Sequence, residues 1–255
     1  MYIILLLILA VLGAYFLWHK SSKAAVAAIE NYPPLLQEHV VFYRQLDAAG
    51  KTRFEGMVDT FLQDTRIEGV GTEVTALDRA LIASAAVIPI FGFPGWRYKN
   101  LTNVILYPDT FDDEFQFEGG SRNILGMVGS GYMNGQMLLS RAALIKAFSK
   151  EHGTENAAIH EFVHLLDMSD GATDGIPENL LTREYVIPWL HLMHQEMHRI
   201  EAGKSDINPY ALTNEAEFFA VAAEYFFEKP GELKVKHPEI YEALGRVFGQ
   251  DLAGG

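Results

Sequence analysis

Residues 154–168 read TENAAIHEFVHLLDM, and this segment narrows the class of protein further than any other. His160 and His164 stand four residues apart, so on a helix they lie on one face and can direct two imidazoles at one metal ion. Glu161 can take a proton from an attacking water and pass it to a leaving amine. Apolar neighbours favour a buried helix; they are Ile159, Phe162, Val163 and Leu165. The pattern predicts a catalytic zinc site, in which a metal-bound water attacks a peptide bond.

A catalytic zinc site needs a third protein ligand, and a second segment offers two candidates. Residues 215–227, EAEFFAVAAEYFF, are predicted to form an apolar helix with too many carboxylates for a plain core element. Glu217 and Glu224 share one face, but two turns, about 10.5 Å, separate them, so both cannot bind one ion. A capping box with Asn214 would explain Glu217 without a metal, and an ion pair would explain Glu224. The residues alone leave both alternatives open.

Acidic residues after the second histidine offer a weaker alternative. Six positions after His164, where metzincins have a third histidine, the chain has Asp170, and Asp167 replaces the glycine of that pattern. The metzincin class is therefore excluded. Asp170 remains a candidate carboxylate ligand, and Asp167 a candidate hydrogen-bond partner of a metal-bound histidine.

A further group of histidines shares one face of a helix predicted over residues 182–202. The group consists of His191, His194 and His198. The neighbouring side chains are polar, which favours a solvated helix face over a second metal site.

Two segments resemble a known family. Residues 160–177, HEFVHLLDMSDGATDGIP, and residues 210–227, YALTNEAEFFAVAAEYFF, resemble the Mlc titration factor A family of zinc metallopeptidases. The second segment is also similar to the catalytic domain of anthrax lethal factor, to which that family is related in fold. Weaker similarity covers residues 101–111. The resemblance implies an α+β, zincin-like domain with a small β-sheet and active-site helices.

The resemblance also assigns roles to individual residues. It implies that His160, His164 and Glu217 hold one Zn²⁺ per chain. It makes Glu161 the general base and Tyr210 the donor that stabilises the oxyanion, a role that suits a phenol. The implied activity is aminopeptidase-like, on a peptide or protein substrate. The alternative is a regulatory protein that sequesters a transcriptional repressor of the Mlc type, with peptidase activity secondary.

Hydrophobic periodicity gives a coarse secondary structure. Residues 101–107 and 126–140 are predicted as strands with Gly-containing connections, and the second region offers an edge for an extended peptide. Helical spacing covers the remaining ordered segments: 35–63, 78–88, 154–168, 182–202, 215–227 and 238–248.

Composition excludes several classes of function. The 255 residues carry a formal net charge of −13, and there is no basic cluster, which argues against a nucleic-acid partner. The chain has no cysteine, so a metal must be held by His, Asp or Glu, and thiol catalysis is excluded.

The amino-terminal stretch predicts a membrane anchor. Residues 1–18 are uncharged and would span about 27 Å as a helix, close to the hydrocarbon thickness of a bilayer. Lys20 and Lys23 follow this stretch, so the positive-inside bias places the rest of the chain on the cytoplasmic side. A secretory signal peptide is the alternative, because Ala25-Val26-Ala27 resembles a cleavage site, but no Lys or Arg precedes the apolar run.

The expected organisation is therefore a transmembrane anchor over residues 1–19, a juxtamembrane linker over residues 20–30 and a metallopeptidase domain over residues 31–255. The location expected from this order is a bacterial inner (cytoplasmic) membrane, with a single pass and a cytoplasmic catalytic domain.

Overall fold

The computed structural model describes residues 31–110, 125–128, 135–149 and 153–254. Its contacts divide the chain into residues 1–32 and residues 33–255, and the fold described below is that of the second part. The predicted anchor and linker lie outside the described residues. Within the described ranges, each helix falls short of the length or the apolar character that crossing a bilayer requires.

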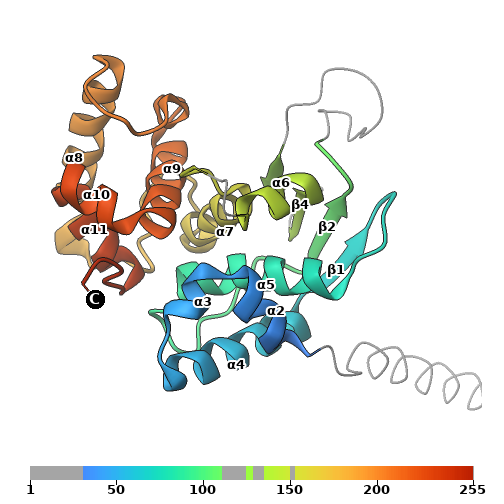
Figure 1. Ribbon diagram of the computed structural model, residues 1–255. Coiled ribbons are helices and arrows are strands. Elements are labelled where there is room, and N and C mark those ends of the chain that lie inside the picture. Colours follow the sequence, from blue (N-terminus) through green and yellow to red (C-terminus); the bar gives the residue numbers. More distant parts are fainter. Residues whose placement is uncertain (1–30, 111–124, 129–134, 150–152, 255) are drawn as a thin grey trace, which may run out of the picture. The chain divides into compact units, whose positions relative to one another are not determined.

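The first half of the fold contains helices and short strands (Figure 1). In chain order the elements are α2 (Tyr32–His39), α3 (Val41–Gln45), α4 (Ala48–Asp64), β1 (Arg66–Gly69), α5 (Ala76–Ile90), β2 (Asn103–Tyr107), β3 (Gly126–Val128), β4 (Gln136–Ser140) and α6 (Arg141–Ala147). The helical periodicity over residues 35–63 thus corresponds to α2, α3 and α4. Asp47 makes one of the breaks, because its side chain accepts a hydrogen bond from the Gly50 amide and caps α4.

The second half of the fold is helical. Its elements are α7 (Ala157–Asp167), the 3₁₀ helix η2 (Met168–Asp170), α8 (Arg183–Glu201), the 3₁₀ helix η3 (Pro209–Leu212), α9 (Glu215–Glu228), α10 (Pro230–Lys236) and α11 (Pro238–Phe248). The helices predicted here from periodicity are confirmed, with ends that differ by a few residues. The sequence did not predict α6 and α10, which have seven residues each.

The described strands form one sheet in the order β1-β2-β4-β3. β1 pairs with β2 and β2 with β4 in parallel, with Val104 opposite Met137. β3 is antiparallel to β4, with Gly126 opposite Leu139, and lies at an edge of the sheet. The expected α+β class with a small sheet is therefore confirmed. β1, four residues long, was not predicted, since so short a strand carries little periodicity.

The helix with the two histidines, α7, lies at the centre of these contacts. It packs against α9 and α5, and it also contacts β3 and β4 (Figure 1). Asn156 starts the helix, because its Oδ1 accepts a hydrogen bond from the Ile159 amide. Phe162 is fully buried, with its ring 5.3 Å from that of Tyr98 and 5.6 Å from that of Phe61. The core thus fixes one face of α7. The face that carries the histidines therefore has a defined orientation.

Gly175 contacts three helices. Its amide donates to Asp167 Oδ2, at the end of α7, over 2.9 Å, and its carbonyl accepts from Trp189 Nε1, in α8, over 2.8 Å. It has φ +74°, and an added Cβ would lie 2.3 Å from the carbonyl oxygen of Glu215, the first residue of α9. Only glycine allows this close approach without strain. The start of α9 is thereby held next to the end of α7.

We expect Gly175→Ala to lower the free energy of unfolding by more than about 2 kcal/mol, because it combines a left-handed backbone with a clash against rigid backbone. Gly171→Ala is the matched control: Gly171 has φ +104°, but no atom lies within 4 Å of an added Cβ. The control should cost only about 1 kcal/mol, from the backbone conformation alone. Urea unfolding measures both values. Equal losses would show that the approach to Glu215 has no energetic importance.

Candidate metal centre

Three donor atoms from two helices converge on one point. His160 Nε2 lies 3.0 Å from His164 Nε2 and 2.9 Å from Glu217 Oε2, and His164 Nε2 lies 3.4 Å from the same carboxylate oxygen. Among the described residues, these three are the group of His, Asp and Glu side chains that could hold a metal ion. The residues that the sequence and the resemblance combined as ligands are therefore brought together.

The separations fit a four-coordinate ion. Two ligands bound about 2.0–2.1 Å from a metal at the tetrahedral angle are roughly 3.3 Å apart. The three distances between the donor atoms lie between 2.9 and 3.4 Å, so an ion could reach all three atoms with small side-chain movements. Two imidazole nitrogens and one carboxylate oxygen are donors that zinc accepts, and three protein ligands leave a fourth position open.

Glu224 contacts the other ring nitrogen of His160. His160 Nδ1 lies 2.7 Å from Glu224 Oε1 and donates to it, which leaves Nε2 free to face the other donor atoms. The second oxygen of Glu224 accepts a hydrogen bond from the Asn156 amide. The two glutamates of α9 thus have different positions: Glu217 faces both histidines, whereas Glu224 fixes the orientation of one.

The charges around His160 favour a cation between the donor atoms. Burial lowers the pKa of His160, but its contacts with Glu217 and Glu224 outweigh burial and raise the pKa to about 10. Burial likewise raises the pKa of Glu217, but hydrogen bonds from the two histidines outweigh it and lower the pKa to about 2. The negative potential that holds a proton on His160 would equally stabilise a divalent cation.

Glu161 is buried beside this group, against the edge strand. It is 8% exposed, and burial raises its pKa above the ordinary value of a glutamate. A Cβ added at Gly126, in β3, would lie 2.7 Å from Glu161 Cγ and 3.0 Å from its Oε1. The absence of a side chain at Gly126 therefore makes room for the Glu161 carboxylate. Sequence reasoning treated Gly126 only as the start of a glycine-containing strand region and missed this contact.

Tyr210, in η3, lies on the solvent side of the group. Its ring centroid is 6.1 Å from that of His160, and the residue is 54% exposed. Partial burial of the side chain and the negative charges of Glu217 and Glu161 raise the pKa of Tyr210. The phenol therefore keeps its proton at neutral pH and can donate a hydrogen bond.

The alternative ligand, Asp170, is not part of this group. Its carboxylate accepts hydrogen bonds from the amides of Ala172 and Glu178, in the turn after α7. Asp167 is fully buried and binds the Gly175 amide, while burial raises its pKa to about 6. The exposed His194 pairs with Glu215 over 3.2 Å, as expected for a solvated helix face.

Asn156 is a residue of the site that sequence reasoning missed. Its side chain caps α7 and also donates to Glu228 Oε1 over 2.7 Å, while its amide donates to Glu224. An Asn immediately before an apolar helical run is an N-cap signal, so the capping role could have been read from the sequence. The contact with the glutamates of α9 could not, because the two segments are 68 residues apart.

A buried helix with two histidines and an adjacent glutamate, facing a carboxylate of a second helix, is the arrangement of the HExxH class of metallopeptidases. The chain belongs to the glucose-regulated metallo-peptidase M90 family, whose sequence profile matches residues 16–249. This membership supports a metallopeptidase that uses a divalent metal.

Individual relatives agree with this assignment. Mlc titration factor A of Escherichia fergusonii is 31% identical over 214 residues, which cover 79% of each chain. Mlc titration factor A of Salmonella agona is 30% identical over 219 residues, or 81% of each chain. An uncharacterised protein of Synechocystis is 27% identical over 244 residues, which cover 91% of this chain and 88% of that one. The expected membership in the Mlc titration factor A family is confirmed.

The two glutamates of α9 should differ in their effect on metal binding. We expect Glu217→Ala to lower zinc affinity more than 100-fold, because it removes a ligand, and Glu224→Ala to lower it about 10–100-fold, because it frees His160 to rotate. Competition with a chromophoric chelator measures both affinities. If Glu224→Ala caused the larger loss, the third ligand would have to be placed two turns further along α9.

Proposed function

We propose that this chain is a zinc-dependent peptidase with an aminopeptidase-like preference. In this proposal His160, His164 and Glu217 hold the metal, and Glu161 is the general base. One observation carries it: three donor atoms from α7 and α9 lie within 3.4 Å of one another and adjoin the buried carboxylate of Glu161 in α7. The coarser conclusion, a metallopeptidase, has the independent support of the family.

The side chains around the donor atoms suit peptide hydrolysis. A bound zinc ion would polarise the scissile carbonyl and lower the pKa of water. Glu161 accepts the proton of the attacking water and delivers it to the leaving amine, and its raised pKa lies closer to neutral pH, where a general base is most effective. Tyr210 donates a hydrogen bond to the oxygen of the scissile carbonyl as negative charge develops there.

The edge strand suggests how a substrate is presented. β3 lies at the edge of the sheet, and Gly126 in this strand adjoins Glu161. An extended peptide that paired with the outer edge of β3 would pass next to the general base. The absence of a Cβ at Gly126 supports this reading, because a larger residue would fill the space between the strand and Glu161.

The regulatory alternative has one specific observation in its favour. Relatives with about 30% identity carry the name Mlc titration factor A, which describes an effect on a partner protein. A protein of this kind could bind a repressor without turnover of a substrate. Glu161→Gln tests both functions, because it removes the proposed base and leaves the proposed metal ligands in place.

We expect Glu161→Gln to lower kcat by about 10²–10⁴-fold while the zinc content is unchanged. The substrates are one peptide with a free amino terminus and the same peptide with an acetylated one, and the aminopeptidase-like preference predicts faster cleavage of the first. Metal analysis of the same preparation gives the zinc content. Glu239→Gln, an exposed glutamate of α11, is the control for loss of one charge.

Two results would contradict parts of this proposal. If wild-type protein with one equivalent of zinc cleaves neither peptide, the regulatory function is favoured. If Glu161→Gln cleaves both peptides at the wild-type rate, the assigned base is wrong.

We also propose that residues 1–19 anchor the chain in a bacterial inner membrane, with the peptidase domain on the cytoplasmic side. The uncharged run over residues 1–18 and the two lysines after it support this proposal. The full chain should remain in the membrane fraction after a carbonate wash. Leu7→Lys combined with Val11→Lys should release it, since each charge costs about 3 kcal/mol near the bilayer centre. Release of the wild-type chain by the wash would exclude the anchor.

A further inference from the structure

The position of Tyr210 depends on how η3 is held. η3 packs against α9 and α8, and Ala211, next to Tyr210, is fully buried. Tyr210 itself is exposed and lies in η3, a 3₁₀ helix of four residues. Helices of this kind have poor hydrogen-bond geometry and little stability of their own. The segment before η3, residues 203–208, is therefore a second support, beside the packing of η3 on α9, for the position of the phenol relative to His160.

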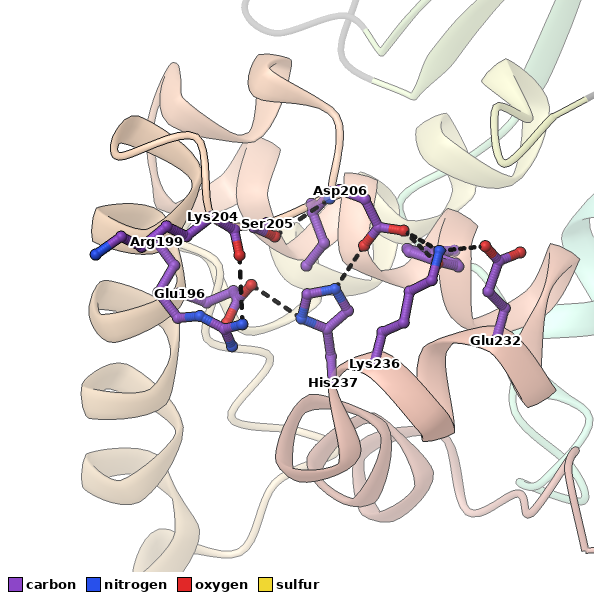
Figure 2. A network of polar contacts seen from close by, with 10 residues as sticks. Glu196, Arg199, Lys204, Ser205, Asp206, Glu232, Lys236 and His237 are labelled. Carbon is purple, nitrogen blue, oxygen red and sulfur yellow. Dashed lines mark hydrogen bonds and ion pairs between the residues drawn. The ribbon is translucent and has the colours of Figure 1, made fainter.

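Asp206, in this segment, receives hydrogen bonds from three donors. Its Oδ1 accepts from His237 Nε2 over 2.7 Å. Its Oδ2 accepts from Lys236 Nζ over 2.6 Å and from the hydroxyl of Tyr225, in α9, over 3.0 Å. Figure 2 shows Asp206 between His237 and Lys236. One carboxylate thus ties the segment to α9 and to the junction of α10 and α11.

His237 extends the network to α8. Its side chain is 2% exposed, and its Nδ1 lies 2.9 Å from Glu196 Oε1, an ion-pair contact without the direction of a full hydrogen bond (Figure 2). Glu196 is itself 4% exposed and accepts from Arg199 Nη1 over 2.9 Å. The imidazole therefore bridges a buried carboxylate of α8 and the partly exposed carboxylate of Asp206.

The charge of Asp206 strengthens these bonds. Burial alone would raise its pKa, but the hydrogen bonds from His237, Lys236 and Tyr225 outweigh burial and hold the pKa well below the ordinary range of an aspartate. The carboxylate is therefore ionised at neutral pH. Bonds from cationic or hydroxyl donors to an ionised acceptor are roughly twice as strong as neutral ones.

Two neighbours of Asp206 carry this anchoring to Tyr210. Ile207 is 2% exposed and holds the segment in the core. Asn208 Oδ1 accepts from the Tyr210 amide over 3.0 Å, and Asn208 Nδ2 donates to Glu155 Oε1 over 3.1 Å. Glu155 directly precedes Asn156, the cap of α7. The chain is thus fixed at three consecutive residues before the turn that carries the phenol.

We infer that Asp206, held by His237 and Tyr225, is a positioning residue that keeps the Tyr210 hydroxyl over the metal centre. The inference rests on the proposed function, because it assumes that Tyr210 contacts the reacting carbonyl. Asp206 itself contacts neither the substrate nor the metal. A merely structural role for the network would lower the stability of the whole fold and would not depend on Tyr210.

A double-mutant cycle separates these two roles. The full-length, zinc-loaded chain is compared as wild type, Asp206→Asn, Tyr210→Phe and the double variant. We expect Asp206→Asn to lower kcat about 10-fold with little change in KM or zinc content, since small misplacements of a catalytic group are costly. In the Tyr210→Phe background the same change should lower kcat less than about twofold, because the hydroxyl to be positioned is already absent.

A milder variant and a matched control accompany the cycle. Tyr225→Phe removes one of the three donors to Asp206 and leaves the packing of α9 intact, so it keeps the test valid if Asp206→Asn folds poorly. Tyr225→Phe should lower kcat by a smaller factor than Asp206→Asn. This effect too should largely disappear in the Tyr210→Phe background. Glu201→Gln removes one exposed negative charge at the end of α8, outside the network, and should leave kcat unchanged.

A second measurement does not depend on activity. Hydrogen exchange of the Ala211 and Thr213 amides, which bond to Asn208 and Tyr210, should become about 10-fold faster in Asp206→Asn. The amides of α7 should exchange at the wild-type rate. Faster exchange throughout the fold would indicate general destabilisation and would overturn the inference.

Failure of the positioning inference can be distinguished from failure of the proposed function. If Asp206→Asn lowers kcat equally with and without the Tyr210 hydroxyl, the positioning inference is overturned and the proposed function stands. If Tyr210→Phe leaves kcat unchanged, both the oxyanion role of Tyr210 and this inference are overturned, and cleavage of the two peptides by the zinc-loaded wild-type chain still decides whether it is a peptidase.

Discussion

The imidazole of His160 lies between two carboxylates of one helix, and the geometry of the site depends on this arrangement. Its Nδ1 is 2.7 Å from Glu224 and its Nε2 is 2.9 Å from Glu217, although two helical turns separate the two glutamates. A ring with a nitrogen on each side can satisfy both. α7 and α9 must therefore keep one register, and the buried aromatic residues of α9 and the contact at Gly175 hold them in it.

The sequence predicted most of the candidate metal centre, because two of its three donor residues stand at a fixed helical spacing. The pair His160 and His164 needs only the geometry of a helix, and Glu161 follows from its place beside the first. The choice between Glu217 and Glu224 needed the family resemblance, since residues on the same face of one helix look equivalent until the partner helix is placed. The capping explanation of Glu217 was half right. The Asn214 side chain does accept a hydrogen bond from the Glu217 amide, but the Glu217 carboxylate turns towards the histidines.

The long elements of the fold were predicted from the sequence. Several short elements were not. The apolar helices from α7 onward gave clear periodicity, whereas β1, α6 and α10 contain seven residues or fewer. The mixture of parallel and antiparallel pairing could not be read from strand patterns, because it depends on how distant segments cross over. The contacts of Gly126 and Asp206 were likewise not predictable from the sequence. Each joins residues that are far apart in sequence, and no local pattern marks them.

The arrangement of the three donor atoms also bears on which ion the chain would select. For two imidazole nitrogens and a carboxylate oxygen, affinity alone ranks Cu²⁺ above Zn²⁺, so donor chemistry does not discriminate in favour of zinc. Copper(II) prefers a planar or tetragonal set of ligands. Two imidazoles fixed one turn apart on a buried helix, with a carboxylate from a crossing helix, instead leave separations close to those of a tetrahedron. The stiffness of the helix pair, together with the supply of each metal in the cell, would therefore determine the occupant.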